Sequence, residues 1–143
     1  MNLSQNFTLE ELTHTNTGLP NVPTDLEIAK LTELVNNVLQ PIRDRLGKPI
    51  KVNSGFRSLA VNKAAGGALP SQHSKGEAAD IEAEDNAELF HTIREYVPFD
   101  QLIWEGGDDS QPDWVHVSYK TAGNRTLVLQ MKVVDGITRY VTI

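Results

Sequence analysis

Two short polar stretches contain residue types that could bind a metal ion. SQHSKGEAAD, residues 71–80, holds His73 and Asp80, and DWVH, residues 113–116, holds His116. Taken singly, each has an ordinary explanation: an exposed loop histidine, an aspartate that opens a strand, and a structural histidine within a strand. Taken together, two imidazoles and one carboxylate form a set that binds zinc at catalytic sites and leaves one coordination position open for water.

Two further residues have side chains suited to catalysis near such a set. Asp113 lies three residues before His116 and follows Pro112, at the entrance of a strand, where a carboxylate could take a proton from a metal-activated water. Arg57 follows a strand end and Gly55, and its guanidinium would suit a substrate carboxylate or a developing oxyanion. Taken singly, a solvated loop acid and a surface arginine are the simpler explanations.

The sequence predicts helices in the first part of the chain, before the candidate site residues. Thr8 and Glu11 form a capping-box pattern, which predicts a short helix over 8–13. Apolar residues spaced by three and four predict a long amphipathic helix from Asp25 to Leu46, and Pro41 predicts a kink or break just before it.

Strands dominate the rest of the chain. In the segment 113–119, alternation places Trp114, His116 and Ser118 on one face and the valines on the other, toward the core. The remaining predicted elements are strands at 50–55, 78–83 and 101–105, helices near 59–64 and at 86–97, and a β-hairpin at about 125–143 around Asp135-Gly136. Helices followed by a mostly antiparallel sheet predict an α+β fold, as one domain over 1–143.

The composition narrows the classes of partner. The chain has 143 residues, a formal net charge of −6 and no cysteine, which argues against a nucleic-acid partner and excludes disulfides and thiolate ligands. The N-terminus has neither the basic nor the apolar region of a signal peptide, and no run approaches the ~18 apolar residues of a membrane span. We therefore expect no membrane partner, and a cytoplasmic location until the protein is released or exported by another route.

The pattern Ser71-x-His73-x-x-Gly76-x-Ala78-x-Asp80 resembles the signature of the zinc D-Ala-D-Ala carboxypeptidase-like peptidases. That group also contains the dipeptidases of vancomycin resistance and the phage L-alanyl-D-glutamate endolysins, and it shares its fold with the hedgehog signalling domain. The resemblance covers roughly residues 25 to 120, and the first helix segment, TLEEL, also looks like the short bacterial and phage members. Its other motifs follow in the same order: SGFRS at 54–58, Asn62, Gly66-Gly67 and DWVH at 113–116.

The resemblance implies a role for each site residue. Asp113 matches the general base, and Arg57 matches the arginine that binds substrate and stabilises the tetrahedral intermediate. The implied ligands of one zinc ion are His73, Asp80 and His116. The implied substrate-side residues are Ser71 and Gln72. The C-terminal hairpin is not part of the signature, and its sequence offers no chemistry.

The resemblance also implies a reaction. We expect a monomeric zinc metallopeptidase that hydrolyses peptidoglycan stem peptides of the cell wall, in the manner of a D-Ala-D-Ala carboxypeptidase. Two alternatives stay open: an L-alanyl-D-glutamate endopeptidase of the phage endolysin type, and a zinc-containing binding module of the same fold without peptidase activity.

Overall fold

The sequence sets where the first two helices begin. In a computed structural model that describes residues 1–143, the Thr8 hydroxyl accepts from the Glu11 N–H at 3.1 Å and caps α1 (Leu9–Leu12). Thr24 caps α2 (Asp25–Leu34) in the same way, since its hydroxyl accepts from the Glu27 N–H. The capping-box prediction for the first helix is confirmed.

The long amphipathic helix is interrupted just before Pro41, as predicted. Pro41 has no N–H, and its ring crowds the carbonyl four residues earlier, so a regular α-helix cannot continue through it. The chain widens into a π-helical turn over Val35–Leu39, in which the Gln40 N–H donates to the Val35 carbonyl, and then forms α3 (Gln40–Leu46). The apolar stripe stays continuous across this turn, and its buried members are Leu31, Leu34, Val35, Val38, Leu39 and Ile42.

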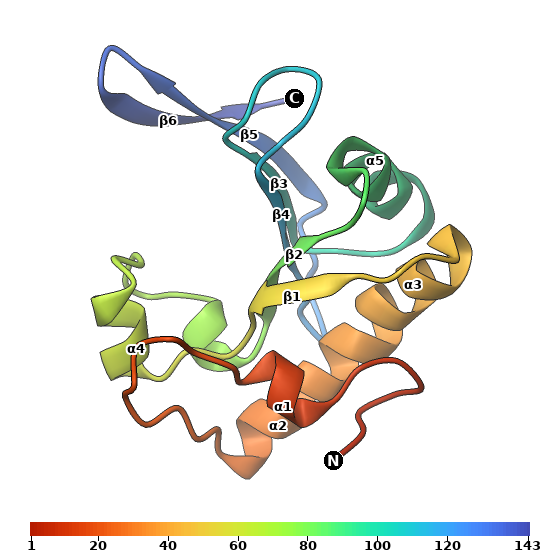
Figure 1. Ribbon diagram of the computed structural model, residues 1–143, viewed down its shortest axis with the longest axis vertical. Coiled ribbons are helices and arrows are strands. Elements are labelled where there is room, and N and C mark those ends of the chain that lie inside the picture. The colour runs from red at the N-terminus through yellow and green to blue at the C-terminus, as the bar shows by residue number, and fades with distance from the viewer.

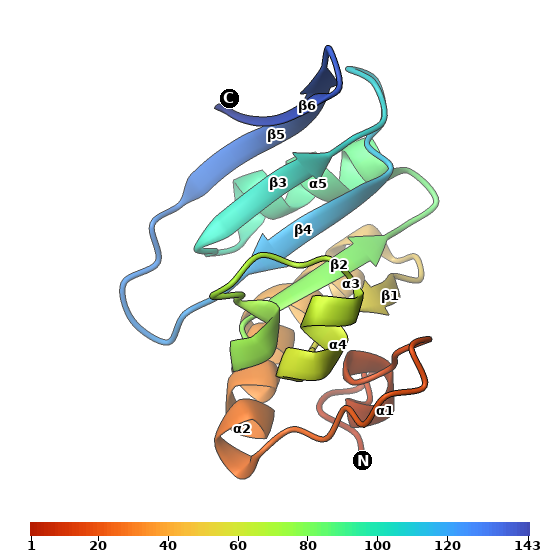
Figure 2. The same ribbon diagram turned by 90° about the vertical axis from the view of Figure 1, so that its left-hand side faces the viewer.

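Six strands form one mixed sheet in the order β1-β2-β4-β3-β5-β6 (Figures 1 and 2). Only β3 and β5 pair in parallel; the other neighbours are antiparallel, so the α+β prediction with a mostly antiparallel sheet is confirmed. The strands are β1 (Lys51–Ser54), β2 (Ala78–Glu82), β3 (Gln101–Glu105), β4 (Trp114–Ser118), β5 (Leu127–Val134) and β6 (Ile137–Thr142).

The two faces of the sheet have different environments. Figure 2 shows α3 and α5 (Asn86–Tyr96) on one side of the sheet and α4 (Leu59–Ala64) on the other. The helix-covered face supplies the core, with Ile81, Val115 and Val117 fully buried. Strand alternation turns the polar side chains of β2 and β4 to the opposite face, beside α4 and the loop that follows it. None of the helices has the length and apolar character that crossing a membrane requires.

The C-terminal hairpin extends from the sheet edge (Figure 1). Asp135 and Gly136 both have positive φ values, 53° and 75°, which is the backbone of a two-residue hairpin turn. The predicted hairpin is therefore confirmed, and every residue of β6 is exposed. Because β5 pairs with β3, the hairpin adds two strands to this edge of the sheet. The polar face of the sheet therefore extends onto the hairpin.

Candidate active site

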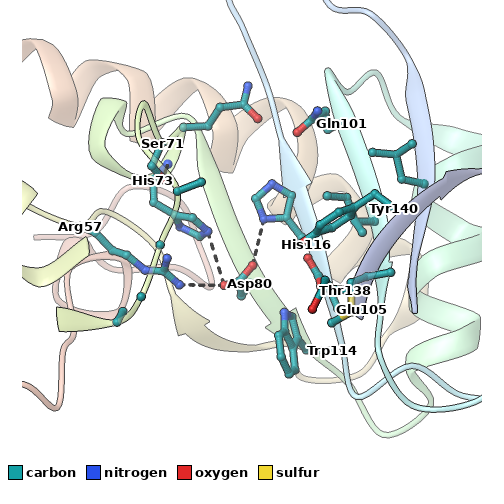
Figure 3. A pocket seen from close by; sticks show the side chains of 18 of the residues that line it. Arg57, Ser71, His73, Asp80, Gln101, Glu105, Trp114, His116, Thr138 and Tyr140 are labelled. Atoms are coloured by element: carbon teal, nitrogen blue, oxygen red, sulfur yellow. Dashed lines mark hydrogen bonds and ion pairs between the residues drawn. The ribbon is translucent and has the colours of Figure 1, made fainter. Parts of the chain in front are cut away.

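His73, Asp80 and His116 converge on the polar face of the sheet (Figure 3). Their ligand atoms all lie within 4.8 Å of one another. Asp80 lies in the middle of β2, beyond the strand entrance expected for it, and is paired directly with His116 of β4. His73 begins a 3₁₀ turn, His73–Lys75, and completes the group from the loop side. Sheet register thus brings the distant His116 beside Asp80, and one loop adds His73 from the same short stretch as Asp80.

A backbone carbonyl fixes the orientation of the His73 ring. His73 Nδ1 lies 2.8 Å from the Gly55 carbonyl oxygen, and a carbonyl can only accept, so Nδ1 carries the proton. The other nitrogen, Nε2, then faces Asp80 Oδ2 at 3.4 Å. Metal-binding histidines are commonly held in this way, with one ring nitrogen donating to a carbonyl and the other directed at the metal.

Gly55 is required where its carbonyl meets His73. A Cβ at this position would lie 2.4 Å from the Leu12 carbonyl oxygen, and that oxygen accepts from the Phe56 N–H at 2.7 Å. The end of α1 therefore packs against bare backbone, which any side chain would push away. The N-terminal helix and the His73 orientation are linked through this one residue.

The three ligand candidates need a cation between them. Their side chains are 6%, 12% and 12% exposed, and His116 Nδ1 faces Asp80 Oδ1 at 3.0 Å. Burial favours the neutral acid, but hydrogen bonds from His116 and His73 outweigh it and hold the pKa of Asp80 well below its usual range. A carboxylate and two ring nitrogens that face one another require protons or a metal ion among them, and the donor set fits zinc with an open coordination position.

Arg57 lies in the pocket where the sequence predicted a substrate-binding cation. Its Nη2 lies 3.1 Å from Asp80 Oδ2, and its Nε donates to the Ser54 hydroxyl at 2.8 Å. Its Nη1 donates to Asn62 Oδ1 at 3.4 Å. Three contacts hold the guanidinium, whose side chain is 17% exposed, at one rim of the ligand group.

Ser71 and Gln72 line the pocket, and both also build the loop that carries His73. The Ser71 hydroxyl accepts from the His73 N–H at 3.2 Å. The Gln72 amide donates to Asp100 Oδ2 at 2.9 Å, and Asp100, which is fully buried, also accepts from Arg125. The Gln72 side chain is thus held by the protein, which differs from the free substrate contact expected for it.

Asp113, the predicted general base, is not among the residues that line this pocket. It is exposed, and its Oδ2 accepts from the Gly107 N–H at 3.0 Å, within the loop before β4. Asp113 lies in the loop just before β4, which begins at Trp114, so the strand does not set its direction. The loop hydrogen bond then holds it there.

Glu105 supplies the acidic side chain that the sequence analysis missed. It ends β3, is paired with Trp114, and lies on the same face as His116 with 8% of its surface exposed. Burial, reinforced by Asp80 and partly opposed by His116, raises the pKa of Glu105 to about 7. A carboxyl of this kind can both accept and return a proton near neutral pH. The local signal was only a lone acid after the apolar run at 102–104, and it is the pairing of β3 with β4 that brings this acid near His116.

The three ligand candidates and Glu105 form the floor of an open pocket of about 670 Å³. Arg57 and Ser71 lie on one wall, together with backbone of the loop at 66–68. Met131 and Tyr140 of the hairpin lie on the opposite wall, and Figure 3 shows Arg57 and Tyr140 on either side of the ligand group. The arrangement leaves room for an extended peptide across the ligands.

A family model described as peptidase M15 matches residues 5–118. The chain belongs to the peptidase M15 family. The family predicted from the Ser71–Asp80 motif is therefore confirmed, and the match includes the first helix segment that also showed the resemblance. A zinc D-Ala-D-Ala carboxypeptidase of Streptomyces albus G is 41% identical over 80 residues, which cover 54% of this chain and 31% of that protein. The chain thus aligns with less than one third of this curated relative.

The peptidase M15 match contains every ligand candidate and Glu105, but it stops before the hairpin. Residues 127–142 form β5 and β6 and still contribute one wall of the pocket. The expectation that the hairpin has no part in the chemistry came from its sequence alone, and the structure places four of its side chains at the site: Leu129, Met131, Thr138 and Tyr140.

Proposed function

We propose that this chain is a zinc peptidase that removes the terminal D-alanine from D-Ala-D-Ala stem peptides of peptidoglycan. The observation that carries the proposal is the convergence of His73, Asp80 and His116 beside Glu105 on the floor of an open pocket. Membership of the peptidase M15 family supports the reaction class. The name of the Streptomyces relative supports both the metal and the substrate.

The donor atoms fit one zinc ion. His73 would bind it through Nε2, His116 through Nδ1, and Asp80 through a carboxylate oxygen. Zinc held by two histidines and one carboxylate supplies Lewis acidity and lowers the pKa of water toward ~7. The Gly55 carbonyl favours the His73 tautomer that leaves Nε2 free to bind a metal.

Glu105 is our candidate for the general base. It shares the pocket and the sheet face with His116, and its raised pKa allows it to accept a proton from the attacking water. The same carboxyl then returns that proton to the nitrogen of the leaving amine. General acid–base catalysis of this kind contributes ~10²–10⁴-fold to the rate.

Arg57 is our candidate for holding negative charge that develops on the substrate. Its guanidinium is positioned by Ser54 and Asn62 before any substrate binds, so little reorganisation is needed. Ser71, on the same wall, can contact the peptide backbone while its hydroxyl still accepts from His73.

The two alternative functions receive less support. An L-alanyl-D-glutamate endopeptidase would use the same ligands, but the relative found is a carboxypeptidase. A binding module without activity would leave unexplained why a proton-accepting carboxyl lies beside the three ligands. The expectations of a monomer and of the protein's location stay predictions.

The direct test uses two blocked peptides, one ending in D-Ala-D-Ala and one containing an L-Ala–D-Glu bond. Zinc-loaded protein should release free D-alanine from the first, as detected by mass spectrometry, and leave the second intact. A chelator should stop the release, added zinc should restore it, and His116→Ala should be inactive. Cleavage of the second peptide alone would establish the endopeptidase instead, and cleavage of neither would favour the binding module.

A further inference from the structure

The C-terminal hairpin forms a wall of the pocket although it lies outside the family match. The match ends at residue 118, whereas β5 and β6 occupy residues 127–142. The hairpin side chains that line the pocket are Leu129, Met131, Thr138 and Tyr140. The wall that lies outside the family match is therefore mostly apolar and carries two hydroxyl groups, those of Thr138 and Tyr140.

Strand register fixes where the aromatic residue of this wall lies. Glu105 is paired with Met131, and Met131 is paired with Tyr140, so the three form one row across three strands. Strands in a sheet are ~4.8 Å apart, which places the Tyr140 Cα about two strand spacings from that of Glu105. A tyrosine side chain on this face can therefore extend toward the centre of the pocket, and Figure 3 shows Tyr140 beside His116.

The Tyr140 hydroxyl is free to donate to a ligand. The residue is 55% exposed, and Figure 3 shows no hydrogen bond from it to the other pocket residues drawn. A tyrosine phenol keeps its proton in neutral solution and can therefore donate a hydrogen bond. The Tyr140 hydroxyl is thus a hydrogen-bond donor on the hairpin wall of the pocket, as the Arg57 guanidinium is on the opposite wall.

The two walls therefore differ in chemistry. The Arg57 wall offers positive charge and loop backbone, whereas the hairpin wall offers a phenol donor together with the side chains of Met131 and Leu129. A peptide that spans the ligand group must place one flank of its scissile bond against each wall. The hairpin wall suits a flank with a small apolar side chain and a backbone carbonyl.

We propose that the hairpin is a specificity wall of the active site, in which Tyr140 donates its hydroxyl to a backbone carbonyl beside the scissile bond and Met131 and Leu129 contact a small apolar side chain of the substrate. This inference rests on the proposed peptidase function. It goes beyond that function because it assigns substrate recognition to residues outside the family match.

Steady-state kinetics on the blocked D-Ala-D-Ala peptide test this assignment. Tyr140→Phe should raise KM ~3- to 10-fold, the range expected for one lost hydrogen bond, with kcat within ~3-fold of the wild type. Tyr140→Ala, which also removes the ring, should raise KM ~10- to 30-fold. Arg139→Ala is the matched control, because Arg139 is exposed on the same strand with the opposite parity, and it should leave both constants unchanged.

A binding measurement separates failure of this inference from failure of the proposed function. Isothermal titration of the same peptide into Glu105→Gln protein gives a Kd without turnover, and adding Tyr140→Ala should weaken that Kd ~10-fold or more. If the wild type hydrolyses the peptide but neither Tyr140 variant changes KM or Kd, the specificity wall is wrong and the peptidase stands. If the wild type hydrolyses no peptide, the peptidase is wrong, and an unchanged Kd on adding Tyr140→Ala would overturn the wall as well. Circular dichroism melting of each variant confirms that the hairpin change leaves the fold intact.

Discussion

Glu105 should destabilise the metal-free protein at neutral and higher pH, and Glu105→Gln should relieve that cost. The side chain is 8% exposed and has no cationic residue bonded to it, so its ionised form is poorly solvated. Its pKa is raised from an ordinary value of 4.5 to about 7, so the folded state favours the protonated acid. The contribution of Glu105 to stability is fully present below pH 4.5 and is lost as the pH rises through about 7.

The magnitude follows from the two pKa values. The interval from 4.5 to about 7 corresponds to at most ~3.4 kcal/mol between the two protonation states. The pocket is open to solvent on one side, which screens the buried charge and reduces the effect. We expect that Glu105→Gln, which keeps the shape and removes the charge, stabilises the protein by ~1–2 kcal/mol more at pH 8 than at pH 5.

Urea unfolding with a chelator, at pH 5 and pH 8, measures this difference for the wild type and the Gln variant. Comparing the two proteins cancels the titration of every group they share. Asp113→Asn is the matched control, because Asp113 is an exposed acid and its replacement should change stability by less than ~0.5 kcal/mol at either pH. The physical reasoning is refuted if Glu105→Gln changes stability equally at both pH values.

Three further outcomes follow from the structure. Gly55→Ala would place a Cβ 2.4 Å from the Leu12 carbonyl, so it should lower the free energy of unfolding in urea by ~1–3 kcal/mol. It should also weaken zinc affinity in a chelator competition, because the His73 ring moves. Unchanged zinc affinity would contradict the link between Gly55 and the orientation of His73. Arg125→Ala should cost ~2–3 kcal/mol at pH 7, since it leaves the buried Asp100 carboxylate short of donors. Hydrogen bonds from Arg125 lower the pKa of Asp100 despite the opposing effect of burial, so this cost should shrink as the pH falls below 3.8; a cost that stays constant in acid would count against the ion pair. Zinc at about 100 times its Kd should add ~2.7 kcal/mol of stability and raise the melting temperature measured by calorimetry, and no rise would argue against a preformed site.

Local elements were predictable because their signals are local. The capping box at Thr8, the apolar spacing from Asp25 and the break at Pro41 each act within a few residues, and the structure confirms all three. The Asp135-Gly136 turn is equally local, since its backbone needs two residues with positive φ. The parallel pairing of β3 with β5 was not predicted, because alternation along a strand does not identify its neighbour.

The candidate site was predictable only in part, for the same reason. The spacing of His73 and Asp80 and the alternation around His116 indicated the ligand group, which the strand register then brings together. Glu105 was missed because its proximity to His116 depends on the pairing of β3 with β4, which no local pattern specifies. The hairpin wall depends on a second long-range pairing, so Tyr140 had no visible connection to the site in the sequence.

The most direct test of the proposed site compares Glu105→Gln with Asp113→Asn in zinc-loaded protein. Both variants replace one acid by its amide, but only Glu105 lies in the pocket with the ligand group. With one zinc bound to each, as measured by elemental analysis, Glu105→Gln should lower kcat on the D-Ala-D-Ala peptide ~10²–10⁴-fold. Asp113→Asn should stay within ~3-fold of the wild type. A fully active Glu105→Gln enzyme, or a loss of activity confined to Asp113→Asn, would contradict the assignment of Glu105 as the base.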